Sequence, residues 1–431
     1  MDIFQLLIQI FNIFWQIIKS WWWVLPPFLL WNPFQTILLW WRQEIAFKQR
    51  EYVMLEIKLP REILKPIRAM EQVCHTFTMI AGDQEPGNFR EKWVEGGTSF
   101  YPSISLEIAG ISGESHFFIR VEKTYQSWVE SAIYAQYPDV EIVEVKDYTR
   151  MVPQDIPDDN WDLEGQDWIL KKPDCYPIKT YEQFETGTEP KEEKRIDPLA
   201  KLLEGLSVLK EGEQIWIQIL LKAPESKWID EGKKIANELA KRPEKKEEKP
   251  KPMILQAAEL LIKGPQEEKQ KEQEQPIYTE MMMTPGEREV VRSIEQKVSK
   301  SGAAAVIRLI YLAKKEVIFK PHMPLGIQFI TSFNAENLNA FGKIPKTATK
   351  VKSALFWFWD KRRAFLKKRK LFYNYVNRFV PLFPYPGKMP VLNTEELATI
   401  FHFPGRTPAP APFVSRIEAK KGEPPAGLPT E

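Results

Sequence analysis

The sequence predicts an α+β protein in which an N-terminal transmembrane helix or helical hairpin precedes ferredoxin-like (split β-α-β) modules. Three observations lead to this prediction. The run between Trp21 and Trp41 is apolar and holds no charged residue. Residues 51–150 alternate between strand and helix patterns in the order β-α-β-β-α-β, which is the order of a split β-α-β unit. A similar alternation returns in residues 196–342.

The predicted membrane anchor occupies residues 1–50. Its central run, WWWVLPPFLLWNPFQTILLWW, is about long enough at helical rise to cross a hydrocarbon core of ~30 Å. Tryptophans favour the membrane–water interface, so we expect six of them to hold the anchor in place. They are Trp21, Trp22, Trp23, Trp31, Trp40 and Trp41.

Two architectures fit this anchor. One is a kinked span over residues 21–41 that follows an in-plane amphipathic helix. The other, which the prolines between the two segments favour, is a hairpin of helices near 3–24 and 33–48. A cleaved signal peptide is excluded because the N-terminal region carries Asp2 instead of a basic residue and no small-residue cleavage site follows.

The anchor also predicts a location. Arg42, Lys48 and Arg50 follow the apolar run, whereas Lys19 is the only basic residue before it. The positive-inside rule therefore places the remainder of the chain in the cytoplasm, at the inner membrane.

The body divides by pattern into further segments. After the module at 51–150, residues 151–195 form an acidic, proline-interrupted linker without the spacing of a calcium loop. The second module, 196–342, is expected to take its first strand from residues 176–181 and to carry a mobile charged insertion at 243–278. Asp197 is followed by Pro198 at a predicted helix start, and Thr284 with Glu287 predicts a capping box.

Composition narrows the chemistry. The formal net charge is only +2, so any attraction to nucleic acid has to be local. The two cysteines and four histidines are scattered without metal-ligand spacing, and no phosphate loop, nucleophile elbow or paired-carboxylate motif occurs. We therefore expect no enzyme activity, no metal and no cofactor.

Residues 343–391 form a basic aromatic segment. Between 343 and 378, twelve basic residues face one acid, and aromatic residues lie among them. This composition suits anionic lipid headgroups and equally suits single-stranded nucleic acid, while a solvated basic helix with one apolar face is the third interpretation. The residues predicted to make the contact are Trp357, Trp359, Lys361, Arg362, Arg363, Lys367, Lys368, Arg369 and Lys370.

The last segment, 392–431, begins with a short helix, for which Asn393 and Glu396 predict a second capping box, and ends in a Pro-rich tail. Five stretches from 116 onward then suggest a family. Their residue ranges are 116–142, 176–185, 197–220, 284–300 and 392–405.

In this order the five stretches resemble the membrane-anchored N-terminal region of bacterial type IV secretion or conjugation-type ATPases, the FtsK/HerA-related motors. In that family a RecA-like motor with the motif GxxxxGK[ST] follows, and this chain contains no such motif. The resemblance implies a non-catalytic, membrane-anchored assembly or scaffold component that works with a separate ATPase motor and assembles into a ring. The alternative is a membrane-tethered nucleic-acid-binding module that uses residues 343–378.

Overall fold

In the part of the chain that the structure describes, nine strands form one antiparallel sheet that organises the molecule. The computed structural model describes residues 15–16, 19–20, 25–60, 63, 65–83, 88–93, 104–184, 197–224, 227–240, 242, 283–352, 357–380 and 389–405. The strands are β1 (Tyr52–Lys58), β2 (Ile104–Ile111), β3 (Glu114–Glu122), β4 (Glu141–Val145), β5 (Trp161–Leu170), β6 (Glu213–Lys222), β7 (Gly302–Lys314), β8 (Phe341–Lys343) and β9 (Val391–Asn393). Their order is β4-β1-β3-β2-β6-β7-β5-β8, and β9 pairs with β7.

The sheet has two halves that mirror each other in strand order. Counted outward from the centre of the sheet, the strands of the first half follow in the order β2, β3, β1, β4. Those of the second half follow in the corresponding order β6, β7, β5, β8. The halves meet where β2 pairs with β6, in a register that runs from Ile104 opposite Leu221 to Ile111 opposite Gln214. Edge-to-edge pairing between β2 and β6 therefore joins the strands of the two predicted modules into one continuous sheet.

The first strand of the second half also differs from the prediction. β5 lies within the stretch expected to be an irregular linker, and residues 176–181 form no strand. The backbone N–H groups of Ile178 and Tyr181 instead donate to the side chains of Glu396 and Thr399, at 2.8 and 3.0 Å.

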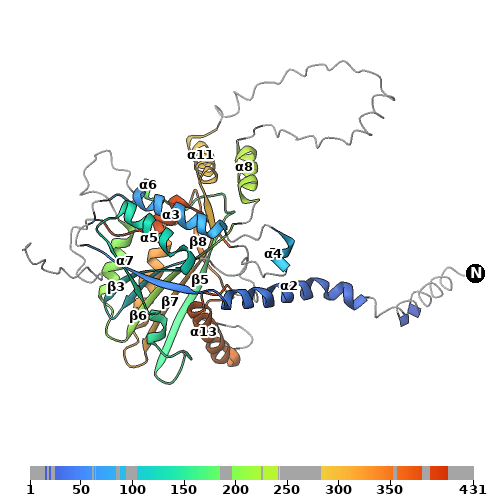
Figure 1. Cartoon of the computed structure of the whole chain (residues 1–431), viewed down its shortest axis with the longest axis horizontal. Coiled ribbons are helices and arrows are strands. Elements are labelled where there is room, and N and C mark those ends of the chain that lie inside the picture. Colours follow the sequence, from blue (N-terminus) through green and yellow to red (C-terminus); the bar gives the residue numbers. More distant parts are fainter. Residues whose placement is uncertain are drawn as a thin grey trace, which may run out of the picture.

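Helices cover both faces of the sheet. Those described are α2 (Leu25–Lys48), α3 (Ile67–Asp83), α4 (Phe89–Trp93), α5 (Gln126–Gln136), α6 (Tyr181–Phe184), α7 (Pro198–Ser207), α8 (Trp228–Leu239), α11 (Pro285–Ser299), α12 (Met323–Thr331), α13 (Asp360–Val376) and α14 (Thr394–Ile400). α3, α5, α7, α12 and α14 pack on one face, which holds the larger hydrophobic core. α13 lies on the opposite side of the sheet (Figure 1).

Glycine allows α13 to lie close to the sheet. A Cβ atom built on Gly165 of β5 would come within 2.5 Å of the Leu309 carbonyl oxygen and 2.8 Å of Leu371 Cδ2 on α13. No side chain fits in that space, so the helix crosses β5 at this position.

Local signals for helix ends agree with the structure. The predicted capping boxes at Thr284 and at Asn393 are confirmed, and the Asp197 side chain caps α7 by accepting from the N–H of Leu199 at 2.7 Å. Such caps depend on residues within one turn, so sequence alone defines them.

The predicted membrane anchor is wrong. Among the described residues, no helix combines the length and the apolar character that a membrane crossing requires. α2 is one continuous helix from Leu25 with Pro33 inside it, so the turn of the predicted hairpin is helical. Its apolar run is interrupted by Asn32 and Gln35 and ends at Arg42, short of the ~20 apolar residues that a span needs. The predicted inner-membrane location was inferred from this anchor and is therefore wrong as well.

Only half of the six predicted anchor tryptophans belong to the described part of the chain. Trp31 and Trp41 are exposed on α2 and Trp40 is half-buried. Trp21, Trp22 and Trp23 lie outside the described residues, as does most of the predicted first helix at 3–24.

Candidate functional site

The predicted basic aromatic residues gather on α13 and on the 3₁₀ turn η6 (Trp357–Trp359) that leads into it. Within α13 seven basic residues accompany one acid, a formal charge of +6 on a helix of 17 residues. Five of the predicted cations are exposed, namely Lys361, Arg362, Arg363, Arg369 and Lys370. Trp359 is 49% exposed, and the side chain of Trp357 lies outside the described part of the structure.

Exposed rings alternate with arginines along one side of this helix. Phe358, Arg362, Phe365, Arg369 and Tyr373 follow one another at steps of four, three, four and four, which places them in one row on a helix. We call this row of five residues the aromatic–arginine stripe. Its three rings, Phe358, Phe365 and Tyr373, are 61%, 42% and 62% exposed.

The arginines of the stripe lie beside aromatic rings. The guanidinium of Arg362 is 5.8 Å from the ring centroid of Trp359, and that of Arg369 is 5.8 Å from the ring centroid of Phe365. Cation–π contacts at this distance orient a guanidinium while leaving its N–H groups open to an acceptor.

Two predicted contact residues instead attach α13 to the body. Lys368 Nζ lies 2.7 and 2.8 Å from the two carboxylate oxygens of Asp162 on β5. Lys367 Nζ donates to the carbonyl oxygens of Pro345 and Ala348, at 3.0 and 3.2 Å. Burial, and then the nearby charge of Arg363, lower the pKa of Lys367. These two lysines are half-buried, unlike the other five cations.

The underside of α13 is apolar and aromatic. Leu371, Phe372 and Tyr375 are buried against the sheet, where Trp216 of β6 stacks with Phe372 and contacts Tyr375. Burying large side chains in this way contributes roughly 1.5–3 kcal/mol each. The helix is therefore amphipathic, with the stripe on its outer side.

A buried ion pair holds the C-terminal end of α13. Arg378 follows the helix with φ 51°, a backbone conformation that non-glycine residues rarely adopt. Its Nε and Nη2 donate to the two oxygens of Glu107 on β2 at 3.0 and 3.1 Å, and Nη1 and Nη2 both donate to Asp147.

This pair shifts the acidity of its members. Burial acts to raise the pKa of Glu107, but the charge and hydrogen bonds of Arg378 outweigh burial and hold that pKa below its ordinary value. The same balance lowers the pKa of Asp147. Glu107 also accepts hydrogen bonds from Ser105, Tyr148 and Gln218, so its charge is fully compensated.

A second arginine reaches the same helix end from β7. Arg308 Nε donates to Asp167 Oδ1 at 2.7 Å, while Nη1 and Nη2 donate to the carbonyl oxygens of Asn374 and Phe379 at 2.9 and 3.2 Å. Gln218 joins the two ion pairs, because it donates to Glu107 and accepts from Arg308 Nη1. Sequence reasoning missed these partners, although a lone Glu107 and a lone Arg308 inside otherwise apolar strands are the signal that could have revealed them.

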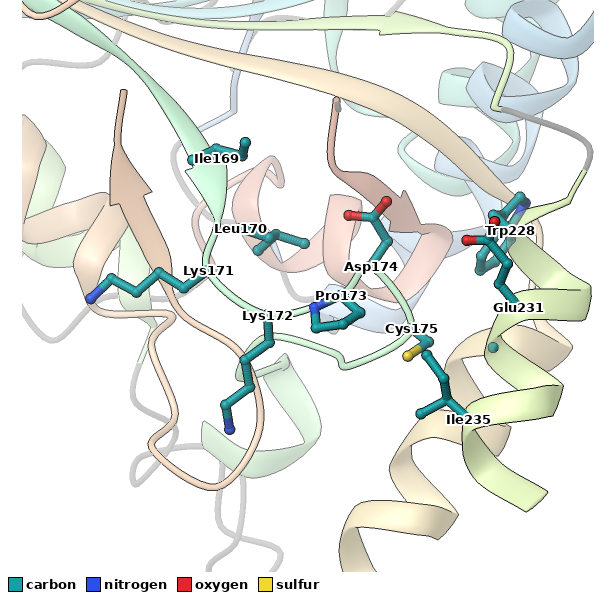
Figure 2. A pocket seen from close by; sticks show the side chains of 11 residues that line it. Ile169, Leu170, Lys171, Lys172, Pro173, Asp174, Cys175, Trp228, Glu231 and Ile235 are labelled. Carbon is teal, nitrogen blue, oxygen red and sulfur yellow. The ribbon is translucent and has the colours of Figure 1, made fainter. Parts of the chain in front are cut away.

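A separate cleft of about 370 Å³ lies between α8 and the loop that follows β5. Cys175, Trp228 and Ile235 supply its apolar lining, and Figure 2 shows Lys171 and Lys172 pointing away from it. Its volume is at the lower end of the range of small-molecule sites. Across the described residues no group of three or more His, Cys, Asp or Glu side chains could hold a metal ion.

Comparison with known proteins identifies a family but no function. The family model of the Domain of unknown function (DUF8128) matches residues 67–320, more than half of the chain. The chain belongs to the DUF8128 family. No curated protein and no solved structure matches it. None of these comparisons links the DUF8128 chain to the conjugation-type ATPases that were expected from its sequence.

The residues matched by the DUF8128 model include the sheet residues that hold α13, but not α13 itself. Glu107, Asp147, Asp167 and Arg308 lie within the matched residues, whereas α13 and Arg378 follow them in the sequence.

Proposed function

We propose that this DUF8128 protein binds single-stranded nucleic acid through the aromatic–arginine stripe of α13. The observation that carries the proposal is the row of three exposed rings separated by two arginines on one helix. Bases stack on aromatic side chains with roughly 1–3 kcal/mol each, and every base offers such a face. Arginines between the rings suit the phosphates that link the bases.

The way α13 is attached supports this use. Arg378, Arg308 and Lys368 join the helix to three strands of the sheet, β2, β7 and β5. A helix that is ordered before its partner arrives loses less conformational entropy on binding. The stripe is thus a preformed surface.

The charge distribution also favours a local site. The whole chain carries +2, whereas α13 alone carries +6. Single exposed apolar residues are common on protein surfaces, but several rings interleaved with cations are the composition found in single-strand-binding grooves.

The two other functions expected from the sequence have less support in the structure. The anchored assembly component and the lipid-contact interpretation both assume that a membrane anchor holds the protein at a bilayer, and the prediction of that anchor is wrong. Nucleic-acid binding, the alternative prediction, does not need the anchor, because Trp359 and five of the predicted cations are exposed on η6 and α13.

The experiment compares the affinity of the full chain and two variants for fluorescein-labelled oligo(dT), measured by fluorescence anisotropy. The stripe variant is F358A/F365A/Y373A. Its matched control, W128A/Y134A/F319A, removes three rings of similar exposure elsewhere on the surface. A loss of 1 kcal/mol per ring already weakens binding about 150-fold for the stripe variant.

We expect the control variant to bind like the wild type. Equal affinity of the stripe variant and the wild type would refute the proposal. The proposal would also be refuted if the wild type bound no oligonucleotide but bound phosphatidylserine vesicles, and if the stripe variant lost this vesicle binding.

A further inference from the structure

Lysines beside α13 remain unused by the proposed stripe. Lys346, Lys350 and Lys352 lie on the segment between β8 and η6, and Lys171 follows β5. All four are exposed, and in the part of the chain that the structure describes none of them has an ion-pair or hydrogen-bond partner for its amine. We call them the edge lysines.

The segment that carries three of them continues the edge of the sheet along β5. Ile344 N–H donates to the Asp167 carbonyl at 3.0 Å, and Thr349 N–H donates to the Gly165 carbonyl at 3.1 Å. The Thr349 hydroxyl in turn accepts from Gly165 N–H at 3.0 Å. The backbone of residues 344–349 is therefore fixed, and Lys346 projects from this defined edge. Lys350 follows the last fixed residue directly, and Lys352 lies two residues further on.

This edge adjoins α13 directly. Lys367 of α13 donates to the carbonyl oxygens of Pro345 and Ala348, which lie on both sides of Lys346. α13 and the lysine-bearing edge thus form one continuous surface.

Lys171 extends the surface along β8. Phe341 belongs to the core beneath the helices of the first face, so Gly342 faces the side that α13 covers. The stem of Lys171 occupies the space that a side chain at Gly342 would fill, with Cγ at 3.2 Å from the Cβ position. Figure 2 shows its amine directed across β8 and away from the cleft.

We infer that the edge lysines contact the phosphates of the single strand whose bases stack on α13, an inference that rests on the proposed function. Rings on the helix would hold the bases, and unpaired ammonium groups on the sheet edge would follow the backbone. Each phosphate neutralised by a lysine releases a counterion, which lowers the slope of log K against log[salt] by about 0.7 for a single strand.

The test measures this slope for a 30-residue oligo(dT) with the full-length chain. The edge variant is K171Q/K346Q/K350Q/K352Q, and the matched control K201Q/K210Q/K233Q/K315Q removes four exposed lysines elsewhere. We expect the slope of the edge variant to become shallower by roughly 3, at 0.7 per lysine. The control variant and K171R/K346R/K350R/K352R should keep the slope of the wild type.

The outcomes separate the two proposals. If the edge variant and its control show the same slope, the assignment of the edge lysines is wrong. If F358A/F365A/Y373A retains wild-type affinity, the proposed function itself is wrong, whatever the edge variant does.

Discussion

Arg378 and Glu107 stand 271 residues apart in the sequence and form two hydrogen bonds, of 3.0 and 3.1 Å, beneath the end of α13. Both side chains are almost fully buried, at 2% and 0% exposed. The pair ties the candidate binding helix to the centre of the sheet, and its disruption should therefore affect stability.

Replacing Arg378 should destabilise the fold severely. R378Q leaves Glu107 and Asp147 without their cation, and removing one partner of a buried pair costs about 3–5 kcal/mol. Urea denaturation followed by circular dichroism would measure this loss. The control R150Q changes an exposed arginine and should stay within about 0.5 kcal/mol of the wild type. A loss below 1 kcal/mol for R378Q would contradict the role of the pair.

Acid should weaken the protein through the same carboxylates. The pKa values of Glu107 and Asp147 are lowered in the folded state, so their contribution is present above the unfolded values of about 4 and is lost as pH falls further. In urea titrations at a series of pH values, wild-type stability should decline below about pH 4. D147N should be less stable at pH 7 and decline less in acid, and a decline as steep as that of the wild type would count against this assignment.

Gly165 should tolerate no side chain. G165A places a methyl group within 2.5 Å of a backbone oxygen and against Leu371, and such overpacking costs roughly 1–3 kcal/mol. Gly82 in α3 offers a matched control, because a Cβ there meets nothing within 4 Å. Thermal unfolding should show G165A well below the wild type and G82A equal to it or slightly above. Equal melting of the two variants would show that α13 does not approach β5 so closely.

The two lysines that hold α13 should differ from those that face solvent. K368Q removes the contact with Asp162, a half-buried pair, and should lower stability by up to about 1 kcal/mol while leaving oligo(dT) affinity near that of the wild type. R369Q removes a cation of the stripe, so it should lower the affinity for oligo(dT) and leave the stability near that of the wild type. Parallel denaturation and anisotropy measurements check this division, and a loss of affinity in K368Q larger than in R369Q would contradict it.

The sequence predicted the features that depend on neighbours in the chain. The capping boxes at Thr284 and Asn393 need only residues within one turn. The alternation of residues 52–59 and 103–121 likewise predicted β1, β2 and β3.

Features that depend on distant partners could not be predicted. β5 was missed because Asp162, Glu164 and Asp167 resemble a solvated loop, yet their partners are Lys368, Lys320 and Arg308. Residues 176–181 resemble a strand, but side chains from the C-terminal segment take their N–H groups. The anchor was predicted from the length of an uncharged run and from its tryptophans, but Asn32 and Gln35 interrupt the apolar character of α2, and no described helix meets the requirement for a span.

Photo-crosslinking tests the central claim most directly, because it reports which side chains touch the bases. Oligo(dT) carrying 5-iodouracil would be irradiated with the full-length chain, and crosslinked peptides identified by mass spectrometry. If bases stack on the aromatic–arginine stripe, crosslinks form at Phe358, Phe365 and Tyr373. Crosslinks confined to other exposed rings, such as Trp128 and Tyr134, would contradict it.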